Sequence, residues 1–223
     1  MAHPIEVNGN QCSSLSVHYP GHGIGVFSLK APLLKKTPTG ALGITVKYDG
    51  LTILGTLVST FEYHDGIELR GCFGAYGWGK TTPPISFGDP SGVKLSTLLS
   101  ALEKATGETF DKKPETRLGT HFVHQAGPAI WALTQVSKSW FVDPNGKTKL
   151  GAWAESKVTK PFEMVNASEP GRTASIAAND LTQWLPGASF ESTKYGKGKV
   201  ESVTHIISPA EYRAHITLAR DNV

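Results

Sequence analysis

The sequence is poor in cysteine, in arginine and in long apolar runs. Its two cysteines, Cys12 and Cys72, lie 60 residues apart, so we expect free thiols and no disulfide framework. Only five of the 22 basic residues are arginine and the net charge is +3, which disfavours nucleic acid as a partner because its recognition uses clustered arginines. No apolar run reaches the 18 residues of a membrane span. Residues 1–21 also lack the basic and apolar parts of a secretion signal.

What is present favours a folded, turn-rich protein. The chain has 223 residues, of which 39% are hydrophobic and 18% charged, enough for one large domain or two small ones. Its 24 glycines and 14 prolines are scattered along the chain, which indicates many turns. Residues 1–21 are polar and show no sustained period, so we predict that they form an N-terminal arm or a loosely packed lead-in strand.

The clearest pattern lies in residues 42–74. Apolar side chains alternate with other residues in the two-residue period of a strand, at Leu42, Ile44, Val46 and Tyr48. Asp49-Gly50 and His64-Asp65-Gly66 then supply turn residues, and the intervening stretch is rich in β-branched and aromatic residues. These features predict an antiparallel meander of three strands.

Residues 85–155 carry a different pattern, typical of an α/β insertion. One helical face is formed by leucines at positions 95, 98, 99 and 102, and Gly107 follows as a helix stop. A second helix is predicted from about Pro128 to Lys138. Trp140-Phe141-Val142 and the stretch from Thr148 to Trp153 then flank the turn residues Asp143-Pro144-Asn145-Gly146, which predicts a hairpin.

The last third returns to β-like patterns. Short strands are expected at Phe162–Val165 and Thr173–Ala177 around the turn Glu169-Pro170-Gly171, and longer ones at Val200–Ile207 and Tyr212–Leu218. The sequence therefore predicts a mainly β (α+β) protein with an antiparallel, β-barrel-like body. We assign residues 22–84 and 156–223 to that body and residues 85–155 to an α/β insertion with two helices and a hairpin.

One stretch matches a nucleotide-binding pattern. Gly74-Ala75-Tyr76-Gly77-Trp78-Gly79-Lys80-Thr81 fits the phosphate-loop spacing of glycine, four residues, glycine, lysine and threonine. A working phosphate loop also needs a helix that begins directly after the lysine. Pro83 and Pro84 follow instead, and proline restrains the preceding residue from helical geometry. We therefore interpret this stretch as a glycine-rich strand end and predict that the protein does not bind ATP or GTP.

The other candidate metal-binding and catalytic residues do not belong to a recognisable motif. His121 and His124 would share a face of a helix and could bind zinc with a third ligand, but no acidic or cysteine partner has a familiar spacing. Cys72 has no protease-like context, and no Gly-x-Ser-x-Gly elbow occurs. We assign no catalytic, cofactor-binding or metal-ligating residue and expect no cofactor.

An aromatic pair and a basic stretch can each be interpreted either as structural or as part of a binding surface. Trp140 and Trp153 flank the predicted hairpin and are interpreted as core partners, with a sugar-binding platform as the alternative. The stretch Lys194-Tyr195-Gly196-Lys197-Gly198-Lys199 is interpreted as a flexible basic loop, with contact to an acidic partner as the alternative.

The order of these segments resembles the baseplate or tail hub proteins of tailed bacteriophages. The resemblance rests on the meander, the leucine-rich helix ending at Gly107, the second helix, the hairpin Trp140-Phe141-Val142-Asp143-Pro144-Asn145-Gly146-Lys147 and a late hairpin from Val200 to Leu218. Proteins of that family combine β-barrel domains with α/β insertions.

The resemblance implies a non-catalytic structural role in the virion. It predicts a homotrimer in the tail tip, assembled in the host cytoplasm, that links the tail tube to the central spike and contacts other baseplate proteins. Two other classes of function remain open: a stand-alone β-barrel module that binds a sugar or peptide, and a hydrolytic or nucleotide-dependent enzyme. Apart from the phosphate-loop spacing at residues 74–81, no sequence motif specific to either class is present.

Overall fold

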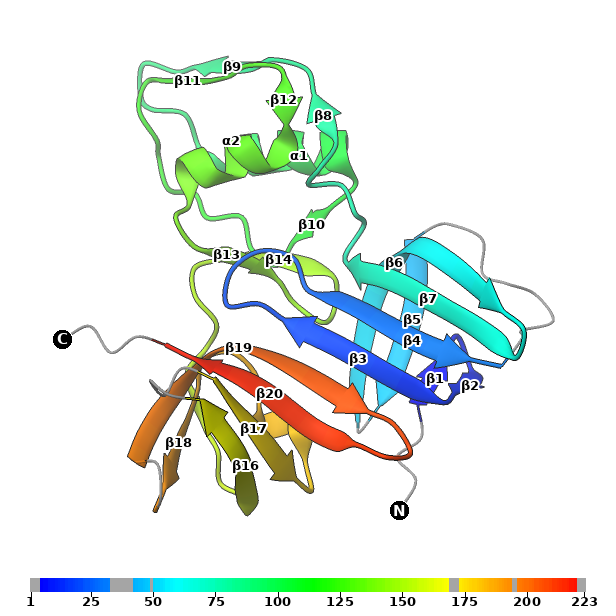
Figure 1. Ribbon diagram of the computed structural model, residues 1–223. Coiled ribbons are helices and arrows are strands. Elements are labelled where there is room, and N and C mark those ends of the chain that lie inside the picture. The colour runs from blue at the N-terminus through cyan, green and yellow to red at the C-terminus, as the bar shows by residue number, and fades with distance from the viewer. Residues whose placement is uncertain (1–4, 33–41, 49, 169–172, 194–195, 220–223) are drawn as a thin grey trace.

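The computed structural model describes residues 5–32, 42–48, 50–168, 173–193 and 196–219. It is mainly β, as predicted, and consists of a large antiparallel sheet with a lobe above it (Figure 1). The first part of the chain forms seven strands: β1 (Ile5–Val7), β2 (Asn10–Cys12), β3 (Ser14–Tyr19), β4 (Val26–Ala31), β5 (Leu42–Tyr48), β6 (Leu51–Tyr63) and β7 (Gly66–Phe73).

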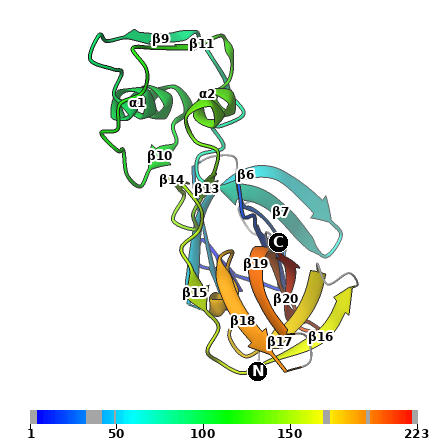
Figure 2. The ribbon, with the colours of Figure 1, turned by 90° about the vertical axis from the view of Figure 1, so that its left-hand side faces the viewer.

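The lobe, which we define as residues 75–151, contains both helices of the described chain. In order, its elements are β8 (Thr81–Thr82), β9 (Ile85–Gly88), α1 (Leu95–Thr106), β10 (Thr109–Phe110), β11 (His121–His124), β12 (Gly127–Pro128), α2 (Ala129–Val136), β13 (Trp140–Val142) and β14 (Lys147–Leu150). Turning the molecule shows the lobe standing clear of most of the sheet (Figure 2).

The last part of the chain returns to the sheet. It forms β15 (Ser156–Lys157), β16 (Phe162–Ser168), β17 (Thr173–Ala178), a 3-10 turn (Leu181–Gln183), β18 (Ala188–Ser192), β19 (Gly196–Ile207) and β20 (Tyr212–Leu218). The turn expected at residues 169–171 lies outside the described residues, as do Lys194 and Tyr195. Gly196–Lys199, expected in a flexible loop, instead begin β19 and pair with β18, which corrects that part of the prediction.

Among the described residues the sheet has 13 strands; β3 lies in the middle of its main path, and β1 and β2 lie at one end. Its main path runs β16-β17-β20-β19-β3-β4-β7-β6-β5-β1-β2. Of the two forms expected for residues 1–21, an arm or a lead-in strand, the described residues 5–21 do not take the arm, because they contain β1, β2 and β3 of the sheet. β3 alternates as a half-buried strand does: Leu15, Val17 and Tyr19 are buried, and the polar residues between them are partly exposed. This two-residue period is present in the sequence but covers only six residues.

The position of β3 also changes the expected body. β3 pairs with β19 on one side and β4 on the other, so it joins a half built from β4–β7 to a half built from β16–β20 (Figure 1). β1 adds to β5, and β2 folds back on β1. The two halves expected to form one barrel-like body are thus united in a single sheet by residues that the prediction had left outside it.

The meander is confirmed. β5, β6 and β7 pair as antiparallel neighbours, and Gly50 at the first turn has a φ of 80°. That left-handed conformation costs glycine little and other residues more. Two register shifts, between Leu42 and Ile44 and between Leu57 and Ser59, increase the local curvature of the sheet.

The helices and the hairpin of the lobe are also confirmed. α1 buries Leu95, Leu98, Leu99 and Leu102, and Gly107 ends it with a φ of 80°. Pro128 precedes α2, and β13 pairs with β14 across a turn in which Gly146 has a φ of 73°. The lobe also includes β8, which pairs with β12, so residues 81–82 belong with the lobe although we had assigned them to the body.

Aromatic side chains fill the core at the junction of lobe and sheet. Trp78 and Trp140 are fully buried there and pack with ring centroids 5.7 Å apart. Trp184, also fully buried, packs instead with Phe162 and Phe190 in the half built from β16–β20. Trp153 stacks on Phe141 at 4.0 Å and donates a hydrogen bond to the carbonyl of Pro20. Trp140 and Trp153 are thus packing residues, as interpreted from the sequence. Neither helix in the described part of the chain has the length and hydropathy of a membrane span.

Candidate functional site

The glycine-rich stretch at residues 74–80 holds a protein carboxylate. The backbone N–H of Gly77 donates to Oε1 of Glu108 at 2.6 Å, and that of Ala75 donates to Oε2 at 3.1 Å. Glu108 is 2% exposed. Converging backbone amides of this kind form an anion-binding nest. The loop therefore has the chemistry that its sequence pattern suggests, but its anion comes from the same chain.

Backbone conformation explains why glycine is needed here. Gly74 has a φ of 73°, and a Cβ at this position would lie 2.6 Å from Oε2 of Glu108. A Cβ on Gly77 would collide with the carbonyl of Thr106, to which Nζ of Lys80 donates a hydrogen bond at 3.0 Å. The lysine of the pattern thus ties the loop to the end of α1.

The segment after the loop has no helix of the kind a phosphate loop requires. Residues 81–82 form β8 and residues 85–88 form β9, with Pro83 and Pro84 between them. Burial raises the pKa of Glu108 above its ordinary value, and this effect outweighs the stabilisation of the carboxylate by the two amides and by Lys80. The geometry is that of a structural tie between α1 and the loop.

His121 and His124 do not form a site together. Both lie on β11, not on a helix, and a three-residue separation on a strand places them on opposite faces, with His121 exposed and His124 buried. The hydroxyl of Thr82 donates to the carbonyl of Gly127, so it accepts a hydrogen bond from Nε2 of His124 at 3.2 Å. Within the described ranges, no three His, Cys, Asp or Glu side chains are grouped as metal ligands.

The cysteines are free thiols in surroundings that disfavour the thiolate. Burial raises the pKa of Cys12 to about 11 and that of Cys72 to about 12. Because the thiolate is the nucleophilic form, neither residue is activated for catalysis.

A buried polar chain joins the two halves of the sheet. Nε2 of His205 lies 2.7 Å from the carbonyl oxygen of Trp184 and must donate to it. In a neutral imidazole Nδ1 is then an acceptor, so it accepts from the hydroxyl of Tyr48 at 3.0 Å. The Tyr48 oxygen in turn accepts from the hydroxyl of Tyr19. This series of hydrogen bonds connects β3, β5 and β19. No sequence pattern predicted it.

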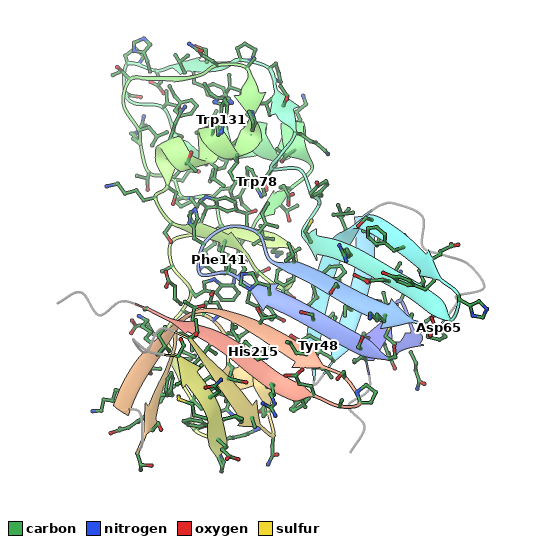
Figure 3. All side chains as sticks on the ribbon, in the orientation of Figure 1. Tyr48, Asp65, Trp78, Trp131, Phe141 and His215 are labelled. Atoms are coloured by element: carbon green, nitrogen blue, oxygen red, sulfur yellow. The ribbon has the colours of Figure 1, made fainter. Side chains whose placement is uncertain are left out.

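Large apolar side chains are exposed on both parts of the molecule. β6 exposes Val58, Phe61 and Tyr63, which are 46%, 43% and 51% exposed. The guanidinium of Arg70 lies 4.8 Å from the centroid of the Phe61 ring. On the lobe, Val123 and Trp131 are 61% and 58% exposed, and Figure 3 shows Trp131 on α2, far from Asp65 at the outer turn of the meander.

No family model matches the chain, and no curated protein matches it. Solved structures with the same fold do exist. The 43 kDa tail protein of prophage MuSo2 from Shewanella oneidensis has a TM-score of 0.67 and 11% identity, covering 99% of this chain and 98% of that one. A tail protein from Neisseria meningitidis MC58 has a TM-score of 0.68 and 10% identity, covering 100% and 98%.

A third similar structure comes from a secretion machine. The c3393 protein of E. coli, described as a type VI secretion system component with structural similarity to the T4 bacteriophage tail proteins gp27 and gp5, has a TM-score of 0.66 and 9% identity, covering 99% of this chain and 77% of that one. At these identities the likeness concerns the fold. Along nearly its whole length, this chain has the fold of those phage tail and secretion-system proteins.

Proposed function

We propose that the protein is a structural component of a phage tail, and specifically a tail-tip hub that links the tail tube to the central spike. The observation that carries this proposal is the extent of the similarity, because 99% or more of the chain aligns with two tail proteins over 98% of their own length. A shared fold alone does not establish a function. Two further features support the proposal: the exposed strand edge and apolar residues of the surface, and the absence of an activated group among the interior residues described above.

The surface offers what a ring-forming subunit needs. β16 pairs only with β17 among the described strands, so one of its edges presents unpaired backbone groups. Val58, Phe61 and Tyr63 expose apolar area on β6 in the other half of the sheet. Two different surfaces on one subunit suit a head-to-tail interface, which closes into a ring when the rotation permits. We propose that the ring is a homotrimer.

The interior supports a non-catalytic role. The backbone amides of Ala75 and Gly77, in the stretch that matches the phosphate-loop spacing, are bonded to Glu108, and burial raises the pKa of the Cys12 and Cys72 thiols. In the proposed role the chain binds tube, spike and other baseplate proteins, and its place in the virion is the tail tip.

Immunogold electron microscopy of purified particles tests this location. Antibody against the protein is expected to label the tail tip. Labelling of the capsid alone, or particles of normal mass and infectivity that lack the protein, would refute the role.

The contribution of β6 can be tested by in vitro assembly with the tube and spike proteins. Phe61→Asp is expected to reduce incorporation because it places a charge in an apolar contact. Thr52→Asp, at an exposed position of the same strand, is the matched control and is expected to assemble normally.

A further inference from the structure

The outer face of the half built from β16–β20 carries a groove of about 390 Å³. This is within the size range of small-molecule sites. It crosses β16, β17, β20, β19 and β3, and nearly all of its lining side chains can form hydrogen bonds. The polar lining residues are His18, Asn166, Ser168, Thr173, Ser175, Ser202, Thr204, Arg213, His215 and Thr217.

Strand register arranges these groups in a row. Asn166 pairs with Ser175, Ser175 with His215, His215 with Thr204, and Thr204 with His18. Directly opposed residues on one face have Cβ atoms about 5 Å apart, so five polar side chains from five strands follow one another across the groove. Figure 3 marks His215 on β20, in the middle of this row.

Ser175 indicates that the row has unused hydrogen-bonding capacity. Its side chain is 9% exposed, and its Oγ has no hydrogen-bond partner within the described part of the chain. Buried hydroxyls are nearly always hydrogen-bonded to protein, water or ligand. Neighbouring hydroxyls are already engaged, since Ser168 bonds Thr173 at 2.6 Å and Thr204 lies 3.0 Å from Nδ1 of His18.

The charges of the groove favour an anion. Arg213 and His215 line it, and none of the described residues that line it carries a carboxylate. Glu211 is the nearest acidic partner of both, at 3.9 Å from Nε of Arg213 and 3.5 Å from Nε2 of His215. Such exposed, loose pairs contribute little, so a ligand can replace them. Within the described part of the chain, no Trp, Tyr or Phe ring lines the groove, which argues against a neutral sugar held by stacking.

We propose that this groove binds a small organic phosphate, with Arg213 holding the phosphate oxygens and Ser175, His215 and Thr204 donating or accepting hydrogen bonds along the row. Arginine recognises phosphate through its planar fork of donors. The groove is larger than a bare anion requires, so the rest of the ligand lies along the hydroxyl side chains of β16 and β17. This site is independent of the proposed tail role.

Isothermal titration of the full chain tests the proposal with four probes: glucose 6-phosphate, inorganic phosphate, glucose and a short oligothymidylate. Saturable binding is expected for glucose 6-phosphate, weaker binding for inorganic phosphate, and none for glucose. Equal binding of glucose would show a neutral polyol site and overturn the proposal. Binding of the oligothymidylate alone would overturn it in favour of a nucleic-acid surface. Absence of saturable binding to any probe at millimolar concentration would also overturn it.

Four variants locate the site. Arg213→Gln is expected to weaken glucose 6-phosphate binding about tenfold or more, as for loss of a charged hydrogen bond, and Ser175→Ala about fivefold. Glu211→Gln is expected to strengthen binding about threefold by freeing Arg213 and His215. Lys157→Gln, an exposed charge change on β15, is the matched control and should bind as the parent does. Unchanged binding by a folded Arg213→Gln variant would contradict the assignment, and Arg213→Lys serves if the glutamine variant unfolds.

Discussion

The lobe and the sheet are assembled from the chain in opposite ways. Every strand pair of the lobe, from β8–β12 to β13–β14, joins residues within the single stretch 75–151. The sheet instead pairs β3 with β19, so that Val17 lies opposite His205. Closing a longer loop costs more chain entropy and slows folding. The lobe therefore depends on local chain, whereas the sheet depends on the first and last parts of the described sequence meeting.

The buried polar groups of the two regions also differ in the sequence distance that they bridge. In the sheet, the neutral chain of Tyr19, Tyr48 and His205 joins three strands from distant parts of the sequence. In the lobe, the carboxylate of Glu108 ties the end of α1 to a loop about 30 residues earlier. A neutral network loses little by burial when every member is bonded, whereas a buried carboxylate needs strong donors. If the two regions are stabilised separately, substitutions in one should leave the other largely protected.

Deletion of residues 1–20 should have the largest effect. It removes β1–β3 and leaves β4 and β19 without their common neighbour, so hydrogen-exchange protection in both sheet halves should fall. Amides of α1 and α2 should keep more of their protection. Lys157→Gln, at an exposed position of β15, is the control and should leave exchange unchanged. Full protection of β4 and β19 after deletion of residues 1–20 would show that the two halves of the sheet do not depend on β3.

Glu108→Ala should destabilise the lobe by about 3 kcal/mol, because the buried amide of Gly77 and that of Ala75 lose a charged acceptor. Chemical denaturation measures the change. Glu115→Ala, which removes an exposed carboxylate paired with Lys94 in the same lobe, should change stability by less than about 1 kcal/mol. Equal effects of the two substitutions would show that the nest is not a structural tie.

Gly146→Val should cost about 2 kcal/mol. Gly146 has a φ of 73°, and an added Cβ would lie 3.2 Å from the carbonyl oxygen of Leu54 in β6. The turn therefore connects the lobe to the sheet as well as closing the β13–β14 hairpin. Thermal melting compares this variant with Gly79→Val, where an added Cβ meets no atom within 4 Å. An unchanged melting temperature for Gly146→Val would show that the turn tolerates a side chain.

Tyr48→Phe should destabilise the sheet by about 1.5 kcal/mol, since it removes both the donor to His205 and the acceptor for Tyr19. Tyr63→Phe, which removes an exposed hydroxyl that donates to Glu68 at 3.1 Å, is the matched control with a smaller effect. If Tyr48→Phe opened the lobe amides before those of the sheet, the two regions would not be separate.

The smallest effect concerns pH. Burial raises the pKa of Glu108 above its ordinary value of 4.5, so the folded protein holds this proton more tightly than the unfolded chain. Its contribution to stability is therefore present at low pH and is lost as pH rises from 4.5 through the raised value. Subtracting the pH–stability curve of Glu108→Gln from that of the parent should reveal this decline. A difference that grows more favourable to the parent as pH rises would have the wrong sign.

The comparison also explains which features could be predicted from sequence. The meander, α1, α2 and the β13–β14 hairpin were predictable because each rests on short-range periodicity or turn residues such as Gly50, Gly107 and Gly146. The place of β3 was not, since its pairing with β19 spans most of the chain. The partner of the glycine-rich loop was equally hidden, because nothing local connects Glu108 with Gly77. The row of polar side chains that includes Ser175 can be recognised only when the register of five strands is known.

Native mass spectrometry of the protein, alone and mixed with the tube and spike proteins of the same phage, tests the proposed hub most directly. The account predicts a species with three times the 23.9 kDa chain mass, which gains both partners in the mixture and loses them on Phe61→Asp substitution. A strict monomer in both settings, from chains shown to be folded, would contradict it.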